Sequence, residues 1–199
     1  MLVCENVSHT RNGVTVFSGV GFCLKAGEGL TVTGQDNNSK TTLLRILCGL
    51  LPTGEGTVLW KGEPVTSGHQ DMVYIGEKNA LKPALTVYDN IQYWAALQGC
   101  EMLVFAALQF FGLQLVAEMK VGMLPEAVQR RVALARLLAI PRLVWVLDNP
   151  LQGLDEEGQA LASGLIATRL KQEGIVICTG MQLGSLLCMD DFLHSPREG

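Results

Sequence analysis

The sequence predicts an α/β fold with a mixed sheet core, an antiparallel β edge and an inserted helical subdomain. Short runs rich in β-branched residues crowd the first part of the chain, and later runs of this kind alternate with helical spacing, as in parallel sheets. Between Val87 and Leu138 the apolar residues recur at helical spacing instead. The 199 residues suffice for one domain with a substantial core, and no flexible linker interrupts them.

The expected strands are short apolar runs bounded by turn-forming or charged residues. In chain order they are Leu2 to Val7, Thr15 to Phe17, Val20 to Leu24, Gly29 to Thr33, Gly56 to Trp60, Met72 to Ile75, Leu143 to Leu147 and Ile175 to Cys178. We expect the helical segment to separate two parts of the sheet. The predicted division of the single domain, residues 1–199, is a core of residues 1–85 and 138–199 and a helical subdomain of residues 86–137.

Composition excludes some function classes. The net charge of −4 argues against a nucleic-acid-binding protein, which normally carries a basic face. Hydrophobic residues make up 48% of the chain and charged residues 17%, which predicts an exposed apolar patch for a partner. The six cysteines and three histidines are scattered without ligand spacing, so we expect no haem or metal site built from them.

The most informative segment is a glycine-initiated loop between an expected strand and a helix. It differs from the phosphate-binding pattern Gly-x-x-x-x-Gly-Lys-Ser/Thr at one position, where Ser39 replaces the second glycine. In such loops backbone N–H groups surround the phosphates, the lysine reaches the outer phosphates and the hydroxyl holds magnesium. The candidate nucleotide-binding residues are Gly34, Gln35, Asp36, Asn37, Asn38, Ser39, Lys40, Thr41 and Thr42.

The substitutions in this loop predict weakened rather than abolished nucleotide contact. Asn37 and Asn38 tolerate positive φ and are expected to keep much of the curvature. Ser39 adds a Cβ where the backbone must approach phosphate closely. The alternative is an ordinary strand-to-helix turn rich in Asn and Asp.

A second element is the run from Leu143 to Leu147, which ends in Asp148. A buried strand that ends in an acid after a phosphate-binding loop is the Walker B pattern, in which Asp148 completes the magnesium shell that Thr41 begins. The alternative is an aspartate that only caps the next turn. Together the two elements favour a P-loop nucleoside triphosphatase.

With these two elements, the chain resembles the ATP-binding subunits of ABC transporters, and among them those of cytochrome c maturation, the so-called haem exporters. The resemblance runs from Leu2 to about Gln182. Besides the loop it is carried by the segments Phe17 to Gly19, Thr41 to Leu50, Val58 to Gly62 and Gln129 to Leu137. It implies ATP and Mg²⁺ as cofactors, with Thr41 and Asp148 as metal ligands, and an ATP-hydrolysing translocase subunit.

Several positions depart from the family. The signature Leu-Ser-x-Gly-Gln is replaced by residues Leu124 to Val128, in which a proline removes a donor and Glu126 adds a negative charge. Asn149 occupies the position of the family's catalytic glutamate, and its amide cannot accept a proton from water. Met181 occupies the position of the family's switch histidine, and its thioether is only a weak hydrogen-bond acceptor. Lys78 replaces the Q-loop glutamine. Arg11 aligns with the adenine-stacking aromatic, and its guanidinium stacks more weakly.

Three functions remain open on the sequence. The first is an ATP-coupled transporter subunit for c-type cytochrome biogenesis. The second is a hydrolysis-deficient nucleotide-binding structural subunit of the same complex, and the third is a soluble ABC protein without a membrane partner. For the first two the resemblance implies a multi-span, CcmB-like membrane subunit and a second copy of the chain as partners, with no nucleic acid and no direct haem site.

The resemblance also implies a place in the cell and a docking surface. We expect a peripheral protein on the cytoplasmic face of the inner membrane or of the equivalent organellar membrane. A short helix of the membrane subunit is expected to dock between the sheet core and the helical subdomain, beside residues Lys78 to Leu85 and the helix that bears Tyr93 and Trp94. The alternative for these two aromatic residues is that they fill the core of the helical subdomain.

Overall fold

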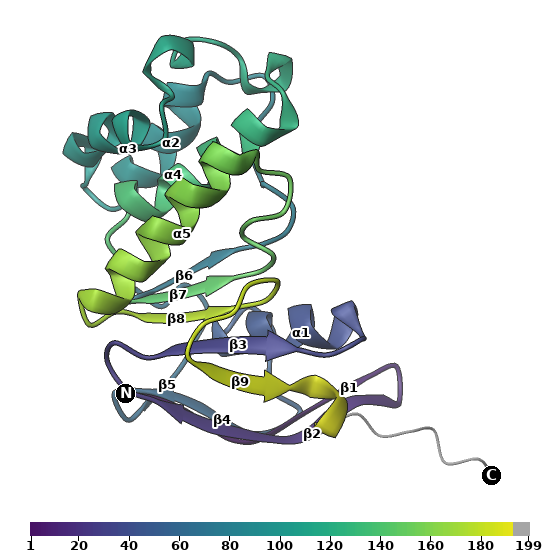
Figure 1. The fold of residues 1–199 in the computed structure, drawn as a ribbon. Coiled ribbons are helices and arrows are strands. Elements are labelled where there is room, and N and C mark those ends of the chain that lie inside the picture. Colours follow the sequence, from purple (N-terminus) through teal and green to yellow (C-terminus); the bar gives the residue numbers. More distant parts are fainter. Residues whose placement is uncertain (193–199) are drawn as a thin grey trace. The chain divides into compact units, whose positions relative to one another are not determined.

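A computed structural model describes residues 1–192 of the chain, which form two compact units (Figure 1). The β unit comprises residues 1–74, 143–148 and 169–192, and the helical unit comprises residues 75–142 and 149–168. The α/β fold class with a mixed set of strands is confirmed. The division into a core of residues 1–85 and 138–199 and a subdomain of residues 86–137 stays a prediction, and residues 193–199 lie outside the described residues.

The first sheet of the β unit is antiparallel and has the order β2-β1-β4-β5. Its strands are β1 (Leu2–Arg11), β2 (Val14–Leu24), β4 (Glu55–Trp60) and β5 (Glu63–Pro64). Asn12 and Gly13, with φ of 52° and 77°, form the tight turn between β1 and β2. The two strands expected at Thr15 to Phe17 and Val20 to Leu24 are one strand, because a β-bulge at Gly19 lets the pairing with β1 continue.

The second sheet has the order β6-β7-β8-β3-β9, with parallel pairing of β7 with β8 and of β3 with both β8 and β9. Its strands are β3 (Gly29–Thr33), β6 (Met72–Ile75), β7 (Val144–Leu147), β8 (Ile175–Cys178) and β9 (Ser185–Cys188). Strand β7 is buried at every residue, as expected for a parallel strand. Neither β5 nor β9 is predicted from the sequence, because β5 has two residues and β9 buries only Leu187.

Helix α1 (Asn37–Leu47) completes the β unit. Its buried apolar residues belong to the same hydrophobic core as β1 of the antiparallel sheet and β3, β7 and β8 of the parallel one. Burial of Leu43, Leu44 and Leu47, about 2 kcal/mol each, therefore holds the helix in place. The loop at residues 34–36 is fixed at one end by β3 and at the other by α1.

The helical unit contains α2 (Val87–Ala96), α3 (Val104–Phe110), α4 (Glu126–Ala139) and residues 156–168 of α5 (Glu156–Lys171). Three 3₁₀ turns connect α2, α3 and α4, at Glu101–Leu103, Gln114–Val116 and Val121–Met123. A capping box, in which Thr86 and Asp89 bond each other's backbone N–H, starts α2. Along residues 1–192, no helix combines the length and the apolar character that a membrane crossing requires.

Candidate functional site

The phosphate-binding loop begins at Gly34 and ends in the first turn of α1. Asp36 is the N-cap of this helix, and its two carboxylate oxygens accept hydrogen bonds from the N–H groups of Asn38 (3.0 Å) and Ser39 (2.9 Å). Asn37 and Asn38 do not make use of their tolerance for positive φ, because the cap starts the helix at Asn37. Within residues 34–42 only Gly34 has positive φ, at 133°.

Ser39, at the position of the missing glycine, is fully buried. Its hydroxyl donates to the backbone carbonyl of Asp36 at 2.9 Å. The side chain therefore ties the loop to the first turn of the helix. The sequence alone indicates the added Cβ at this position but does not reveal the hydrogen bond.

Lys40 and Thr41 both reach groups at the mouth of the loop. The Lys40 ammonium donates to the carbonyl oxygen of Gly34 at 2.7 Å. The Thr41 hydroxyl donates to a carboxylate oxygen of Asp148 at 2.6 Å. The structure thus brings together the two residues that the sequence nominates as metal ligands, although 107 positions separate them.

Asp148, at the end of β7, is buried and accepts hydrogen bonds from two further hydroxyl groups. Thr179 donates from the end of β8 at 2.8 Å, and Tyr74 donates from β6 at 3.4 Å. Burial is the largest cause of a raised pKa at Tyr74, which keeps its phenol protonated and able to donate. Sequence reasoning missed Tyr74 and Thr179. The available signal was their place at the carboxyl ends of strands, where ligand-binding residues of parallel sheets gather.

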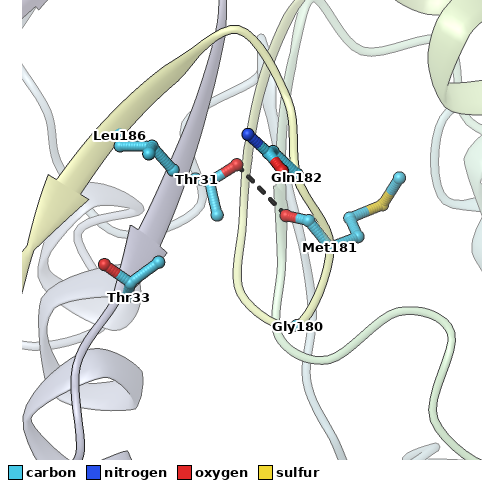
Figure 2. Close-up of a pocket in the computed structure, with 6 residues that line it drawn as sticks. All are labelled: Thr31, Thr33, Gly180, Met181, Gln182 and Leu186. Atoms are coloured by element: carbon cyan, nitrogen blue, oxygen red, sulfur yellow. Dashed lines mark hydrogen bonds between the residues drawn. The ribbon is translucent and has the colours of Figure 1, made fainter.

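Met181, at the expected switch position, lies in the loop after β8 and lines a cavity of about 410 Å³. Figure 2 shows the cavity residues, which are Thr31, Thr33, Gly180, Met181, Gln182 and Leu186. The Met181 carbonyl accepts a bond of 3.1 Å from the Thr31 hydroxyl, and its side chain extends away from Thr31 (Figure 2). The thioether provides no strong donor or acceptor at this position.

Lys78, Asn149 and the signature segment belong to the helical unit, whereas Thr42 lies in α1 and Arg11 at the end of β1 in the β unit. Lys78 is exposed, and Asn149 has a left-handed backbone with φ of 46°. In the signature segment, Pro125 is the N-cap of α4 and supplies no side-chain cap, and Glu126 occupies the first turn. Pro125 therefore brings neither a hydroxyl nor a backbone N–H to this helix start.

Arg130 is a buried residue of α4. It belongs to the segment Gln129 to Leu137, but the sequence alone does not reveal its contacts. Its guanidinium donates to the carbonyl oxygens of Gly76 (2.8 Å), Asn149 (2.9 Å) and Pro150 (3.3 Å). It also donates to the side chain of Asn79 at 3.1 Å. Arg130 thus holds the segment that precedes Lys78 and the segment that begins at Asn149 within the same unit.

Comparison with known proteins places these features in a family. The ABC transporter family model matches residues 17–152. A relative from Wolbachia pipientis, the "Cytochrome c biogenesis ATP-binding export protein CcmA", is 40% identical, and the alignment covers 94% of this chain and 93% of that protein. Proteins of the same name from Mesorhizobium japonicum and Vibrio parahaemolyticus are 40% and 34% identical, over 92% and 99% of this chain and 93% and 96% of theirs.

Solved structures agree on the fold. A protein from Pyrococcus furiosus described as an ABC transporter ATP-binding protein superposes with a TM-score of 0.85 at 22% identity, covering 97% of this chain and 99% of that chain. An ATP-binding subunit of an ABC transporter gives the same TM-score at 18% identity, covering 95% of this chain and 85% of that chain. The family model spans more than half of the residues, and the relatives align over nearly the whole length. The chain therefore belongs to the ABC transporter family of ATP-binding proteins.

Proposed function

We propose that this chain is the ATP-binding subunit of an ABC exporter that serves cytochrome c biogenesis. The observation that carries the proposal is the hydrogen bond of 2.6 Å between Thr41 and Asp148, which joins the phosphate-binding loop to the end of β7. The relatives at 40% identity carry the name of a cytochrome c biogenesis ATP-binding export protein, which supplies the biological setting.

ATP and Mg²⁺ fit the residues of the β unit. The hydroxyl of Thr41 and the carboxylate of Asp148 are oxygen donors of the kind that Mg²⁺ prefers, and they already lie side by side. A bound Mg²⁺ would offset the negative charge of the outer phosphates. Lys40 supports ATP binding, because its ammonium lies at the mouth of the loop, within reach of the Gly34 carbonyl.

Hydrolysis is expected to be slow. The amide of Asn149 can orient a water molecule but cannot take its proton, and loss of a general base typically costs about 10² to 10⁴ in rate. Met181 offers only a thioether where the family uses an imidazole. Glu126 adds a negative charge to the first turn of α4, at the segment that the family uses to contact ATP bound to the second copy.

The proposed partners are a multi-span, CcmB-like membrane subunit and a second copy of the chain. Tyr93 and Trp94 support the first partner, because their side chains are 46% and 38% exposed and form an edge-to-face pair with a centroid distance of 5.5 Å. Lys82 lies over the Tyr93 ring at 4.4 Å, which gives the apolar surface a charged rim. This arrangement suits a peripheral protein on the cytoplasmic face of the inner membrane, or of the equivalent organellar membrane.

The test has two stages. Isothermal titration of the purified chain with magnesium-ATP should give weak binding that Lys40→Ala abolishes. Co-purification from native membranes should then recover a membrane subunit, and the complex should hydrolyse ATP far more slowly than an ordinary ABC ATPase. Binding that is equal in the wild type and Lys40→Ala would reject the nucleotide site, and recovery of no membrane protein would reject the exporter assignment.

A further inference from the structure

The N–H groups of the phosphate-binding loop are bonded to carboxylates of the chain itself. Those of Asn38 and Ser39 donate to Asp36, at 3.0 Å and 2.9 Å. The N–H of Gln35 donates to a carboxylate oxygen of Asp190 at 3.0 Å. These bonds use the type of donor that such a loop offers to phosphate oxygens.

The cation of the loop is also turned toward the chain. The Lys40 ammonium lies 2.7 Å from the carbonyl oxygen of Gly34. The loop therefore closes on itself, with the Asp36 carboxylate as the anion at the helix N-terminus, where the helix dipole favours negative charge.

We propose that Asp36 is the residue that sets the affinity of this loop for polyphosphate, because its carboxylate is an internal competitor for the N–H groups of Asn38 and Ser39. The proposal rests on the proposed ATP-binding function and adds the regulation of that site. A phosphate group that takes these two donors displaces the Asp36 side chain. The displaced carboxylate stays close to the loop, and its negative charge repels the bound phosphate.

The backbone of the loop favours side-chain displacement over rearrangement of the loop. The Ser39 hydroxyl holds the carbonyl of Asp36 at 2.9 Å, and Ser39 is fully buried. The main chain at residue 36 is thus anchored independently of the carboxylate. The Asp36 side chain is half-buried and turns toward solvent by rotation about its own bonds.

An asparagine in this position would cap the helix without competing as an anion. Asn and Asp are about equally good N-caps, so Asp36→Asn is expected to leave the fold in place. The single amide oxygen of asparagine can accept from Asn38 or Ser39, whereas the two carboxylate oxygens of Asp36 accept from both. Hydrogen bonds to an ionised acceptor are roughly twice as strong as those to a neutral one. Removal of the charge and of one acceptor oxygen therefore weakens the internal competitor.

The experiment measures binding of magnesium-ATP, and separately of inorganic tripolyphosphate, to the wild type, Asp36→Asn and Asp191→Asn. Asp191 is a matched control, because it is an exposed aspartate beside Asp190 and removal of its charge leaves the loop contacts intact. We expect Asp36→Asn to bind both ligands about tenfold more tightly, a difference of about 1.4 kcal/mol. Because tripolyphosphate has no base, a gain in its affinity shows that Asp36 acts on the contacts with phosphate and not on those with adenine.

A salt series separates direct competition from general repulsion. The gain in Asp36→Asn should persist at 0.5 M NaCl, where the Debye length has fallen to about 4 Å, whereas any gain in Asp191→Asn should vanish. Equal affinities of the wild type and Asp36→Asn, or equal gains in both variants, would overturn the proposal while leaving ATP binding intact. If Asp36→Asn binds no more ligand than Asp36→Asn combined with Lys40→Ala, the ATP site and this proposal are both wrong.

Discussion

Asn149 adopts a backbone conformation that few side chains tolerate. Its φ of 46° lies in the left-handed region, where asparagine is several-fold enriched among non-glycine residues. The guanidinium of Arg130 donates a hydrogen bond to the Asn149 carbonyl at 2.9 Å, which fixes the orientation of this peptide group. A substitution of Asn149 therefore affects the stability of this backbone conformation as well as the activation of water.

This coupling predicts the outcome of restoring a glutamate. Asn149→Glu alone should lower the free energy of unfolding by about 1 kcal/mol, because glutamate lacks the short polar side chain whose local hydrogen bonding lets asparagine tolerate positive φ. It should raise ATP turnover only slightly, since Met181 and the segment from Leu124 to Val128 stay unchanged. Urea unfolding and a steady-state ATPase assay of the assembled complex measure the two effects.

The matched comparison restores the other positions as well. Ser39→Gly, Asn149→Glu and Met181→His, combined with a Leu-Ser-x-Gly-Gln signature at residues 124–128, should raise turnover far more than the sum of the separate changes. Residues that act as one catalytic unit are non-additive. A large rescue by Asn149→Glu alone would mean that the other departures do not limit the reaction.

Sequence reasoning reaches some of these residues and not others for physical reasons. Thr41 and Asp148 are found because a motif fixes the place of each at the end of a strand. Thr179 and Tyr74 are missed because their contact with Asp148 depends on the strand order β6-β7-β8, which the sequence does not specify. The role of Asp36 is missed because the loop is interpreted through its glycines rather than as a helix N-cap.

Helix α1 shows how an element's two ends are set by single residues. Asp36 caps its start, and Gly49 follows its end with φ of 68°. The N–H of Leu50 reaches back to the carbonyl of Arg45 at 2.8 Å, which closes a Schellman-type turn. The glycine is needed there for conformation and also for space, because a Cβ would lie 2.6 Å from the backbone carbon of Thr66.

A pair of glycine-to-alanine variants tests this account. Gly49→Ala should lower the free energy of unfolding by more than 1 kcal/mol, because it combines left-handed strain with a backbone clash. Gly164→Ala, in the middle of α5 where a Cβ meets no atom within 4 Å, should raise it by about 0.5 to 1 kcal/mol. Both are measured by urea unfolding, and a loss of equal size in the two variants would contradict the role given to Gly49.

Elements with a strong pattern are predicted well. Strands β3, β6 and β8 have the expected bounds, since each is an apolar run between turn-forming or polar residues. Strand β9 is missed because its stability comes from pairing with β3 rather than from its own residues, of which Leu186 is 60% exposed. The bulge at Gly19 is missed because it depends on Ser8 of the neighbouring strand, whose hydroxyl accepts from the Gly19 N–H at 3.1 Å.

At the scale of the whole molecule, most large exposed apolar residues belong to the helical unit. Within the helical unit the most exposed are Leu97, Met102, Phe105, Leu115 and Met123, at 58% to 98% of their full exposure. Surfaces of this kind mark interfaces with partners. Among the described residues, the large exposed apolar side chains are therefore concentrated in the helical unit.

Site-directed crosslinking tests where the membrane partner docks. Pro83→Cys, in a variant whose exposed Cys23 and partly exposed Cys100 and Cys188 are replaced by serine, should crosslink to a membrane subunit in native membranes. Pro83 is preferable to Asn79, because the Asn79 side chain accepts a hydrogen bond from the buried Arg130. The reaction is followed by a mobility shift on denaturing gels.

The control for this experiment is a cysteine on the β unit. Val14→Cys, at a hairpin residue that is 69% exposed, should give no crosslink with the same reagent. Equal crosslinking at both positions would indicate random collision with the membrane. Crosslinking at Val14 alone would place the docking surface on the antiparallel sheet.

The position of β3 between β8 and β9 has a consequence for the making of the protein. The ribosome produces Thr31 of β3 150 residues before Met181, whose carbonyl accepts a hydrogen bond from the Thr31 hydroxyl. At about 5 to 20 residues per second, translation leaves a gap of roughly 8 to 30 s during which β3 lacks both neighbours. A nascent chain thus exposes a buried apolar strand with open edges, and the phosphate-binding loop that follows β3 lacks its supporting sheet until β8 and β9 have been synthesised.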